Sequence, residues 1–193
     1  MANVNKPFGL RPIGNLSATG AQKQYGYLIA DNQAGAIFQG DLVVVYDGYI
    51  IKYDATTHAA PTGVFNGCNY VDPTSGKPTW SNYYPGSVNI TTGYINAEVL
   101  DDPNQLFLIQ AAGTITQADI GKNADPTGAT TGSVTTGVSN GTLGTPAKTA
   151  ALTMKIVGLS NTPSNELGQY SVVIVKLNQH QYGSVGVAAD GAP

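Results

Sequence analysis

The segment GDLVVVYDGYIIKYDA, residues 40–55, decides the fold class. Two runs rich in Val, Ile and Tyr, residues 42–46 and 49–53, flank the dipeptide Asp47-Gly48. Asp-Gly between two such runs is a strong signal for a two-residue β-hairpin, because both residues tolerate the positive φ angles of that turn. We therefore predict that the two runs pair as antiparallel strands.

Further β-rich runs follow at short intervals and are separated by Gly, Pro, Asn and Asp. They lie at residues 24–30, 62–71, 95–100, 105–113, 151–160 and 168–182. Short strands at regular spacing are typical of sandwiches and barrels. The sequence predicts an all-β fold, a compact antiparallel β-barrel or sandwich with an extended N-terminal arm and long loops.

The composition excludes a mainly helical protein and disfavours a nucleic-acid partner. Charged residues make up 11% of the chain, against about 25% in ordinary soluble domains. Glu occurs twice and Arg once, so the residues that usually build helices are scarce. The net charge is −3, and the few Lys residues form no basic patch of the kind that binds nucleic acid. Because low charge also removes a common defence against self-association, we expect the protein to assemble.

The sequence offers little for catalysis or metal binding. Cys68 is the single cysteine, and His58 and His180 lie far apart in the chain. Zinc sites need clustered Cys and His, and we interpret Cys68 as a small core residue. Five of the ten Asp residues precede Pro or Gly, which is typical of turn formers. No phosphate-binding, nucleophile-elbow or dinucleotide motif occurs. We therefore expect no enzyme activity, no catalytic residues, no cofactor and no metal.

The chain divides into three predicted parts. Residues 1–24 form an extended N-terminal arm, residues 25–182 a β-rich domain, and residues 183–193 a flexible C-terminal tail. Within the domain, residues 127–145 hold five Gly and seven Thr and predict a long loop or a poorly buried hairpin. Thr116 is expected to cap a single helical turn that stops at Gly121. The chain starts without an apolar leader and contains no membrane-length apolar run, so we expect an unsecreted protein without a membrane partner.

Large aromatic side chains gather in GKPTWSNYYPG, residues 76–86. The segment carries Trp80, Tyr83 and Tyr84 between two prolines. Trp and Tyr dominate the anchors of protein interfaces, so we predict an aromatic contact loop. Two other interpretations stay open at this point, which are internal packing and stacking against a sugar.

Several segments resemble the head decoration, or capsid cement, proteins of tailed bacteriophages. The resemblance lies in PFGLRPIG (7–14), TGVFNGCNYVDPTSGKPTWSNYYPG (62–86), ITQADIGKNAD (115–125) and VVIVKLNQHQYG (172–183). Together these segments make up 56 of the 193 residues and leave out the Gly/Thr-rich stretch. They are packing and turn patterns and contain no catalytic motif.

The resemblance implies a virion structural protein on the outer surface of the capsid, assembled in the host cytoplasm. It would form a homotrimer, bind the major capsid protein and stabilise the expanded shell. The N-terminal arm would lie along that shell, with contacts from Phe8, Leu10, Arg11, Pro12 and Ile13. The alternative is a carbohydrate-binding β module, a tail or surface adhesin, that uses Trp80, Tyr83 and Tyr84. A β-rich hydrolase is a third hypothesis, and it would need facing carboxylates in a cleft.

Overall fold

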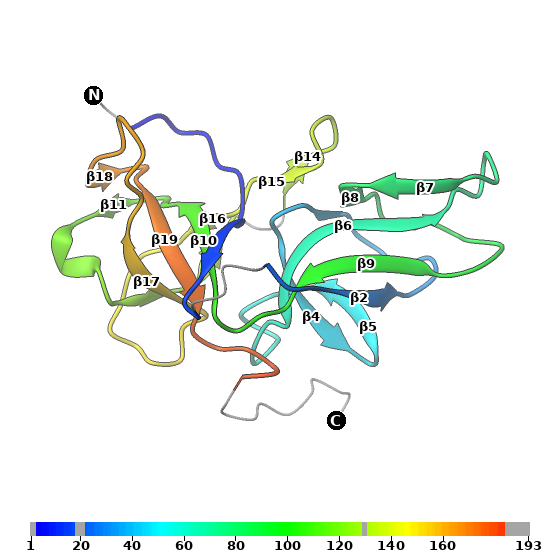
Figure 1. Cartoon of the computed structure of the whole chain (residues 1–193), viewed down its shortest axis with the longest axis horizontal. Helices are drawn as coiled ribbons and strands as arrows, with labels where there is room; N and C mark the ends of the chain where they lie inside the picture. The colour runs from blue at the N-terminus through cyan, green and yellow to red at the C-terminus, as the bar shows by residue number, and fades with distance from the viewer. Residues whose placement is uncertain (1–2, 18–21, 129–130, 184–193) are drawn as a thin grey trace.

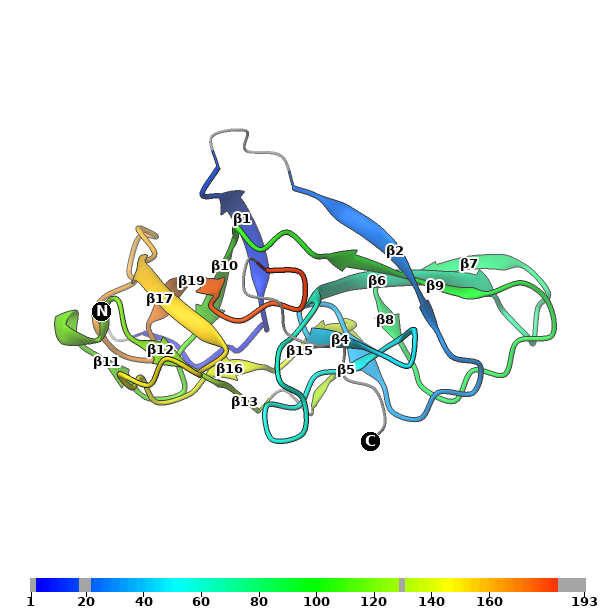
Figure 2. The same ribbon diagram turned by 90° about the horizontal axis from the view of Figure 1, so that it is seen from below.

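Two groups of β-strands, each a β-sheet, lie side by side, joined by loops and short two-stranded ladders (Figure 1). The computed structural model describes residues 3–17, 22–128 and 131–183. Within these residues there is no α-helix, and every ladder between named strands is antiparallel. The prediction of an all-β, antiparallel fold is confirmed. Figure 2 shows the same two groups from below.

The first group is a five-stranded sheet built from both ends of the chain. Its order is β1 (Arg11–Asn15), β10 (Gln105–Gln110), β19 (Val172–Leu177), β17 (Met154–Leu159) and β12 (Asn123–Ala124). In β19 buried Val173 and Val175 alternate with partly exposed neighbours, as a sheet with one covered face requires. The strands predicted at 151–160 and 168–182 therefore pair with each other, as β17 and β19.

The second group is a six-stranded sheet that holds the predicted hairpin. Its order is β2 (Gln24–Ile29), β9 (Ile95–Leu100), β6 (Gly63–Val71), β4 (Leu42–Tyr46) and β5 (Tyr49–Lys52), and β7 (Pro78–Ser81) also pairs with β6. Tyr46 faces Tyr49 across the turn, and Asp47 and Gly48 both have positive φ. The hairpin prediction is confirmed at the register that the Asp-Gly turn dictates.

Four short two-stranded ladders lie in the segments that connect the strands of the two sheets. They are β3 (Ile37–Phe38) with β8 (Tyr83–Tyr84), β11 (Thr114–Ile115) with β18 (Gly168–Gln169), β13 (Pro126–Thr127) with β16 (Thr142–Leu143), and β14 (Gly132–Ser133) with β15 (Val138–Ser139). A 3-10 helix, η1 (Gln117–Asp119), begins after Thr116, which confirms the predicted helical turn. None of the described residues forms a helix with the length and apolarity needed to cross a membrane.

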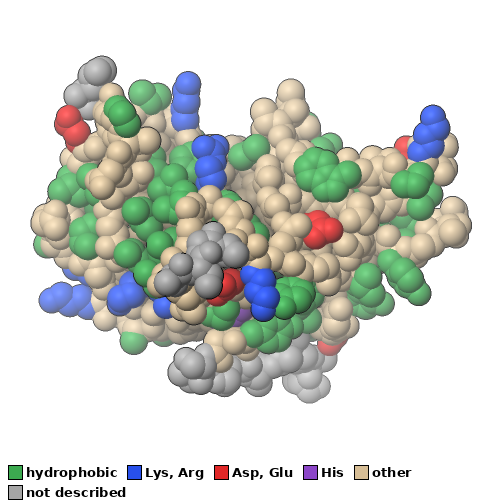
Figure 3. All heavy atoms as spheres, in the orientation of Figure 1, with side chains coloured by type: hydrophobic (Ala, Val, Ile, Leu, Met, Phe, Trp, Pro, Cys, Tyr) green, Lys and Arg blue, Asp and Glu red, His purple; other side chains and the backbone are tan. Residues whose placement is uncertain are grey.

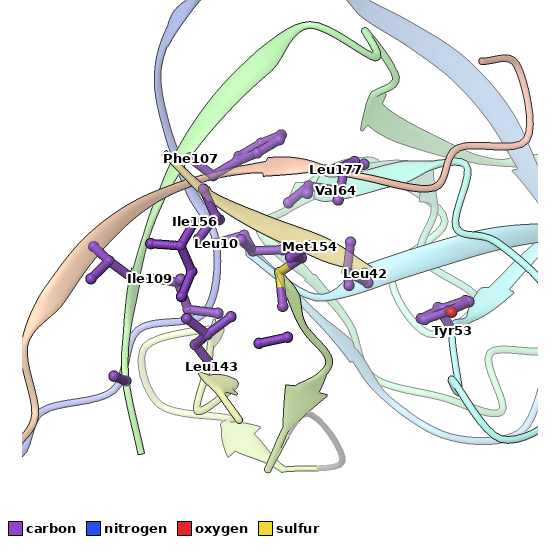
Figure 4. Packing of buried hydrophobic residues seen from close by; sticks show 14 of the residues in the cluster. Leu10, Leu42, Tyr53, Val64, Phe107, Ile109, Leu143, Met154, Ile156 and Leu177 are labelled. Atoms are coloured by element: carbon purple, nitrogen blue, oxygen red, sulfur yellow. The ribbon is translucent and has the colours of Figure 1, made fainter. Parts of the chain in front are cut away.

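Two hydrophobic clusters form the core. One packs against the six-stranded sheet and includes Phe65 and Cys68 of β6 and Tyr84 of β8. The other joins the two sheets, because it contains Leu42 and Val64 as well as residues of the five-stranded sheet. Figure 4 shows this second cluster. The six-stranded sheet does not close into a barrel, although its outer strands β2 and β5 approach each other. Of the two predicted architectures, a sandwich-like arrangement is the one that fits.

The Gly/Thr-rich stretch is better packed than predicted. Residues 127–145, outside the undescribed 129–130, form the β13–β16 and β14–β15 ladders. Leu143 and Ser139 are completely buried. The description as a poorly buried hairpin is therefore wrong for these two residues, because each contacts a distant part of the chain: Ser139 bonds Asp41, and Leu143 joins the core.

The predicted N-terminal arm is partly built into the fold. Residues 11–15 form β1, which pairs with β10 of the same chain, and Leu10 is buried. Residues 1–2 and 18–21 of the arm lie outside the described residues. The same holds for the predicted tail, of which only Gly183 is described.

Candidate functional site

The N-terminal segment is clamped to the domain at Gly9 and Leu10. The Gly9 N–H donates to the Gly141 carbonyl at 3.2 Å, and the Leu10 N–H donates to the Gly40 carbonyl at 2.9 Å. Gly9 has φ +66, and a Cβ there would lie 2.7 Å from the Cβ of Ser139. Only glycine fits this close approach. Leu10 is 4% exposed and packs in the core cluster (Figure 4), so it is a core residue and not an exposed contact residue.

The other predicted contact residues lie on or beside β1. The Arg11 guanidinium is exposed and lies 4.9 Å from the centroid of the Phe8 ring, which is a cation–π arrangement. Pro12 pairs with Phe107, and Ile13, which is 43% exposed, lies within the register shift between Pro12 and Gly14. The structure thus brings Phe8, Arg11, Pro12 and Ile13 together along one edge of the five-stranded sheet.

A buried aspartate, Asp41, connects the Gly/Thr-rich stretch to the six-stranded sheet. Its carboxylate forms an ion pair with Lys52 at 2.7 Å and accepts hydrogen bonds from Ser139 Oγ and from the Phe38 N–H. Burial raises the pKa of Asp41, and the Lys52 charge and these hydrogen bonds oppose the rise. The residue joins β4, β5 and the Gly/Thr-rich stretch, which makes it a structural element.

A second polar cluster surrounds Asp101 at the end of β9. The Tyr27 hydroxyl donates to Asp101 Oδ2 at 2.7 Å, and burial is the main cause of the raised pKa of Tyr27. His180 is 5% exposed, and its Nδ1 accepts a hydrogen bond from the Tyr182 N–H at 3.0 Å. Burial lowers the pKa of His180, against the opposing charge of Asp101. His180 is therefore a buried imidazole that is neutral near pH 7.

The three aromatic residues predicted as a contact loop separate into two environments. Tyr84 is completely buried, and its hydroxyl donates to the Gln33 carbonyl at 3.0 Å. Tyr83 stacks on Phe38 with ring centroids 5.6 Å apart. Both residues belong to β8 and pack internally, so they are not part of an exposed contact loop. Trp80 on β7 is different, because it is 62% exposed.

Trp80 lies beside a network of amides that centres on Glu98. Glu98 Oε1 accepts hydrogen bonds from the side chains of Asn69 at 3.3 Å and Asn96 at 3.2 Å, and Oε2 accepts from Gln24 at 2.8 Å. Asn66 in turn donates to Gln24 at 2.8 Å. These residues come from β2, β6 and β9, and in β9 Asn96 and Glu98 alternate with the buried residues of the strand. They form a polar outer face of the six-stranded sheet.

No known family model, curated protein or solved structure matches this chain. The assignment of a site therefore depends on the geometry alone. Among residues 3–17, 22–128 and 131–183, no three His, Cys, Asp or Glu side chains gather in a way that could hold a metal ion. Cys68 is buried in the core, as predicted, and burial raises the pKa of its thiol to about 12.

Sequence reasoning missed the Glu98 network and the Asp41 cluster. Both depend on contacts between residues far apart in the chain, such as Gln24 with Glu98 and Asp41 with Ser139. Glu98 carried one signal, because it is the single charged residue in an otherwise neutral run, INAEVL, that forms β9. Two surfaces emerge as candidates for function: the edge of β1, and the polar outer face around Trp80 and Glu98.

Proposed function

We propose that the chain is a virion structural protein that decorates the outside of a tailed-phage head and stabilises its expanded shell. The proposal includes a homotrimer whose partner is the major capsid protein. One observation carries it: the N-terminal segment presents apolar side chains beside an open sheet edge. Val4 is 65% exposed, Ile13 43% and Leu16 53%.

The edge of β1 suits a partner chain. β1 is the outermost strand of its sheet and pairs with β10 alone among the described strands. An unpaired edge offers backbone N–H and C=O groups to a strand from another protein, while neighbouring apolar side chains add affinity. Pro12 lacks an N–H and the register shifts between Pro12 and Gly14, which limits extended pairing with other copies at this edge. The edge therefore favours a short, specific contact.

The composition supports the same proposal. With 11% charged residues, the surface has few ions that would lose water in a wide contact. A protein that binds the expanded shell and not its precursor stabilises the expanded state by mass action. Many identical contacts arranged by the symmetry of the head add their effects through multivalency.

The test compares two point variants for binding to expanded heads prepared without the protein. Ile13→Asp places a charge in the proposed contact, and we expect binding to weaken at least about tenfold, equivalent to about 1.4 kcal/mol. Val157→Asp is the matched control, because Val157 is also a strand residue and is 40% exposed, but lies on β17. Both variants should keep the far-UV circular dichroism of the parent chain. Equal binding by the two variants would contradict the assigned role of β1.

A carbohydrate-binding module is the second candidate function. The exposure of Trp80 favours it, and it concerns a different surface from the edge of β1.

A further inference from the structure

The outer face of the six-stranded sheet carries a straight row of side chains across four strands. Trp80 on β7 pairs with Asn69 on β6, Asn69 pairs with Asn96 on β9, and Asn96 pairs with Leu28 on β2. Directly paired residues project from the same face of a sheet. Cys68 and Ala97 are the sequence neighbours of Asn69 and Asn96, and both are completely buried. Successive residues of a strand point to opposite faces, so the row lies on the face away from the core.

Trp80 is held in place although it is exposed. Its six-membered ring lies over Gly67, where a Cβ would come within 2.9 Å of the indole Cζ2. Gly67 has φ +142 and sits at a register shift between Phe65 and Gly67, opposite Glu98. The glycine and the shift therefore create a shelf for the ring. Trp80 as a whole is 62% exposed, so the face of the ring away from Gly67 is open to a ligand.

A shallow, open hollow of about 380 Å³ adjoins the exposed ring. It lies between Trp80 and Tyr94, and Asn69 forms part of its wall. Tyr94 is 75% exposed, so two aromatic side chains flank one amide. The size suits one or two small rings, and pockets that combine aromatic walls with a few placed polar groups are typical of small-molecule sites.

Asn69 lines the hollow and connects it to the mostly uncharged Glu98 network. Glu98 accepts hydrogen bonds from Asn69, Asn96 and Gln24, which orients the three amides. Each amide has two N–H donors and a carbonyl acceptor, so hydrogen-bonding capacity remains after the contact with Glu98. Ordering these groups in advance reduces the entropy lost when a ligand binds.

The chemistry of this face selects a neutral, hydroxyl-rich ligand. Flat aromatic rings pack against the C–H faces of sugar rings, and amides and carboxylates bond the hydroxyl groups at their edges. No Lys or Arg is among the described residues that line the hollow, and the Glu98 carboxylate would repel phosphates, sulfates and sialic acids. Figure 3 shows this face over β6, β7 and β9 with hydrophobic side chains and one acidic group, and with a basic and an acidic side chain at the outer end of β6 and β7.

We propose that the hollow beside Trp80 and Tyr94, with Glu98 and its amides, is a binding site for a neutral oligosaccharide. The site differs from the loop expected from the sequence, because Tyr83 and Tyr84 pack internally and are replaced by Tyr94 and the Glu98 network. It is separate from the edge of β1, so a decoration protein could use it to hold a surface glycan while attached to a head.

The test uses the isolated chain on an array that holds neutral and acidic glycans. We expect saturable binding to one class of neutral glycan. The neutral glycan bound most strongly is then titrated while the fluorescence of Trp80, the single tryptophan of the chain, is recorded. Ligand stacking on the indole should change the emission in step with binding.

Three variants locate the site. Trp80→Ala and Asn69→Ala should each weaken binding at least about tenfold, and both should fold because both residues are exposed. Tyr182→Ala is the control, since Tyr182 is 57% exposed but lies outside this face, and it should bind as the parent does.

Three results would overturn the proposal. They are an array without a bound neutral glycan, a preference for acidic glycans, and neutral-glycan binding that survives Trp80→Ala. If no neutral glycan binds and Trp80→Ala changes the oligomer mass measured by light scattering, the face is a contact between copies of the chain. These experiments use the isolated chain, so their outcome does not depend on attachment to a phage head. The glycan site can therefore be refuted while the decoration role stands, and the reverse.

Discussion

The indole of Trp80 packs on Gly67, and the two residues fit only because Gly67 has no side chain. A Cβ on Gly67 would lie 2.9 Å from both the Trp80 ring and the Ser81 carbonyl oxygen. The φ of +142 is also one that residues with a Cβ rarely adopt. The position of the Trp80 indole on the outer face of the sheet therefore depends on a glycine in β6.

Gly67→Ala should both destabilise the protein and displace the indole. Steric overlap and backbone strain of this kind cost about 1–3 kcal/mol. Urea unfolding measures the loss, and the emission of the single tryptophan reports the displacement. Gly113→Ala is the matched control, because no atom lies within 4 Å of a Cβ there and its φ is not positive. Equal effects of the two substitutions would contradict the described packing.

The buried ion pair of Asp41 and Lys52 leads to a second prediction. Removing one partner of a buried pair costs about 3–5 kcal/mol because the other charge stays unpaired. Asp41→Asn and Lys52→Met should each approach the lower end of that range, since the Lys52 side chain retains 22% exposure. The double variant should recover part of the loss in a double-mutant cycle. Strictly additive losses would show that the two side chains do not interact.

His180 should make the stability of the protein fall in mild acid. Burial lowers its pKa in the folded state below the ordinary value of 6.5. The unfolded chain therefore binds a proton more readily, and stability present above pH 6.5 is lost as the pH falls toward the folded-state pKa. A loss of about 1 kcal/mol would lower the midpoint by about 2–4 °C in a chain of this size.

Thermal melts between pH 7.5 and pH 5.5 measure this loss. His180→Asn provides the comparison, because its side chain is neutral throughout and can still accept the Tyr182 N–H. The variant should show a flatter profile than the parent. A parent profile as flat as that of the variant would mean that His180 is not buried as described.

Local signals predicted the parts of the fold that local chemistry controls. The Asp47-Gly48 turn fixes the β4–β5 register within a few residues, and the run at 95–100 coincides with β9. Thr116 begins η1 because its hydroxyl and the Asp119 carboxylate lie three residues apart. Each of these features depends on neighbours in the sequence, so a single sequence contains the information.

Long-range contacts determined what the sequence did not predict. Pro and Gly in residues 7–14 predict an extended arm that contacts a partner. Leu10 is buried instead, because its N–H bonds the Gly40 carbonyl and its side chain packs in the core. Trp80 and Tyr84 are similar in sequence context, yet one is 62% exposed and the other completely buried. Which aromatic faces solvent depends on the pairing of β7 with β6 and of β8 with β3, and neither pairing leaves a local pattern.

The packing of the N-terminal segment changes what its removal should do. Deleting residues 3–15 removes β1, the Leu10 side chain and the hydrogen bonds of Gly9 and Leu10. Loss of a buried leucine alone costs about 2–5 kcal/mol. We expect a clear drop in the urea midpoint as well as loss of binding to heads. An unchanged midpoint would show that the segment is an independent arm.

The central claim is that the chain is a structural component of a phage head, and counting its copies in purified particles tests it most directly. Quantitative mass spectrometry against labelled peptides of this chain and of the major capsid protein gives the ratio of the two. The proposal predicts a fixed ratio that corresponds to hundreds of copies on each head, on the order expected for a symmetric, multivalent coat. Absence from intact particles, or a few copies on each, would contradict it.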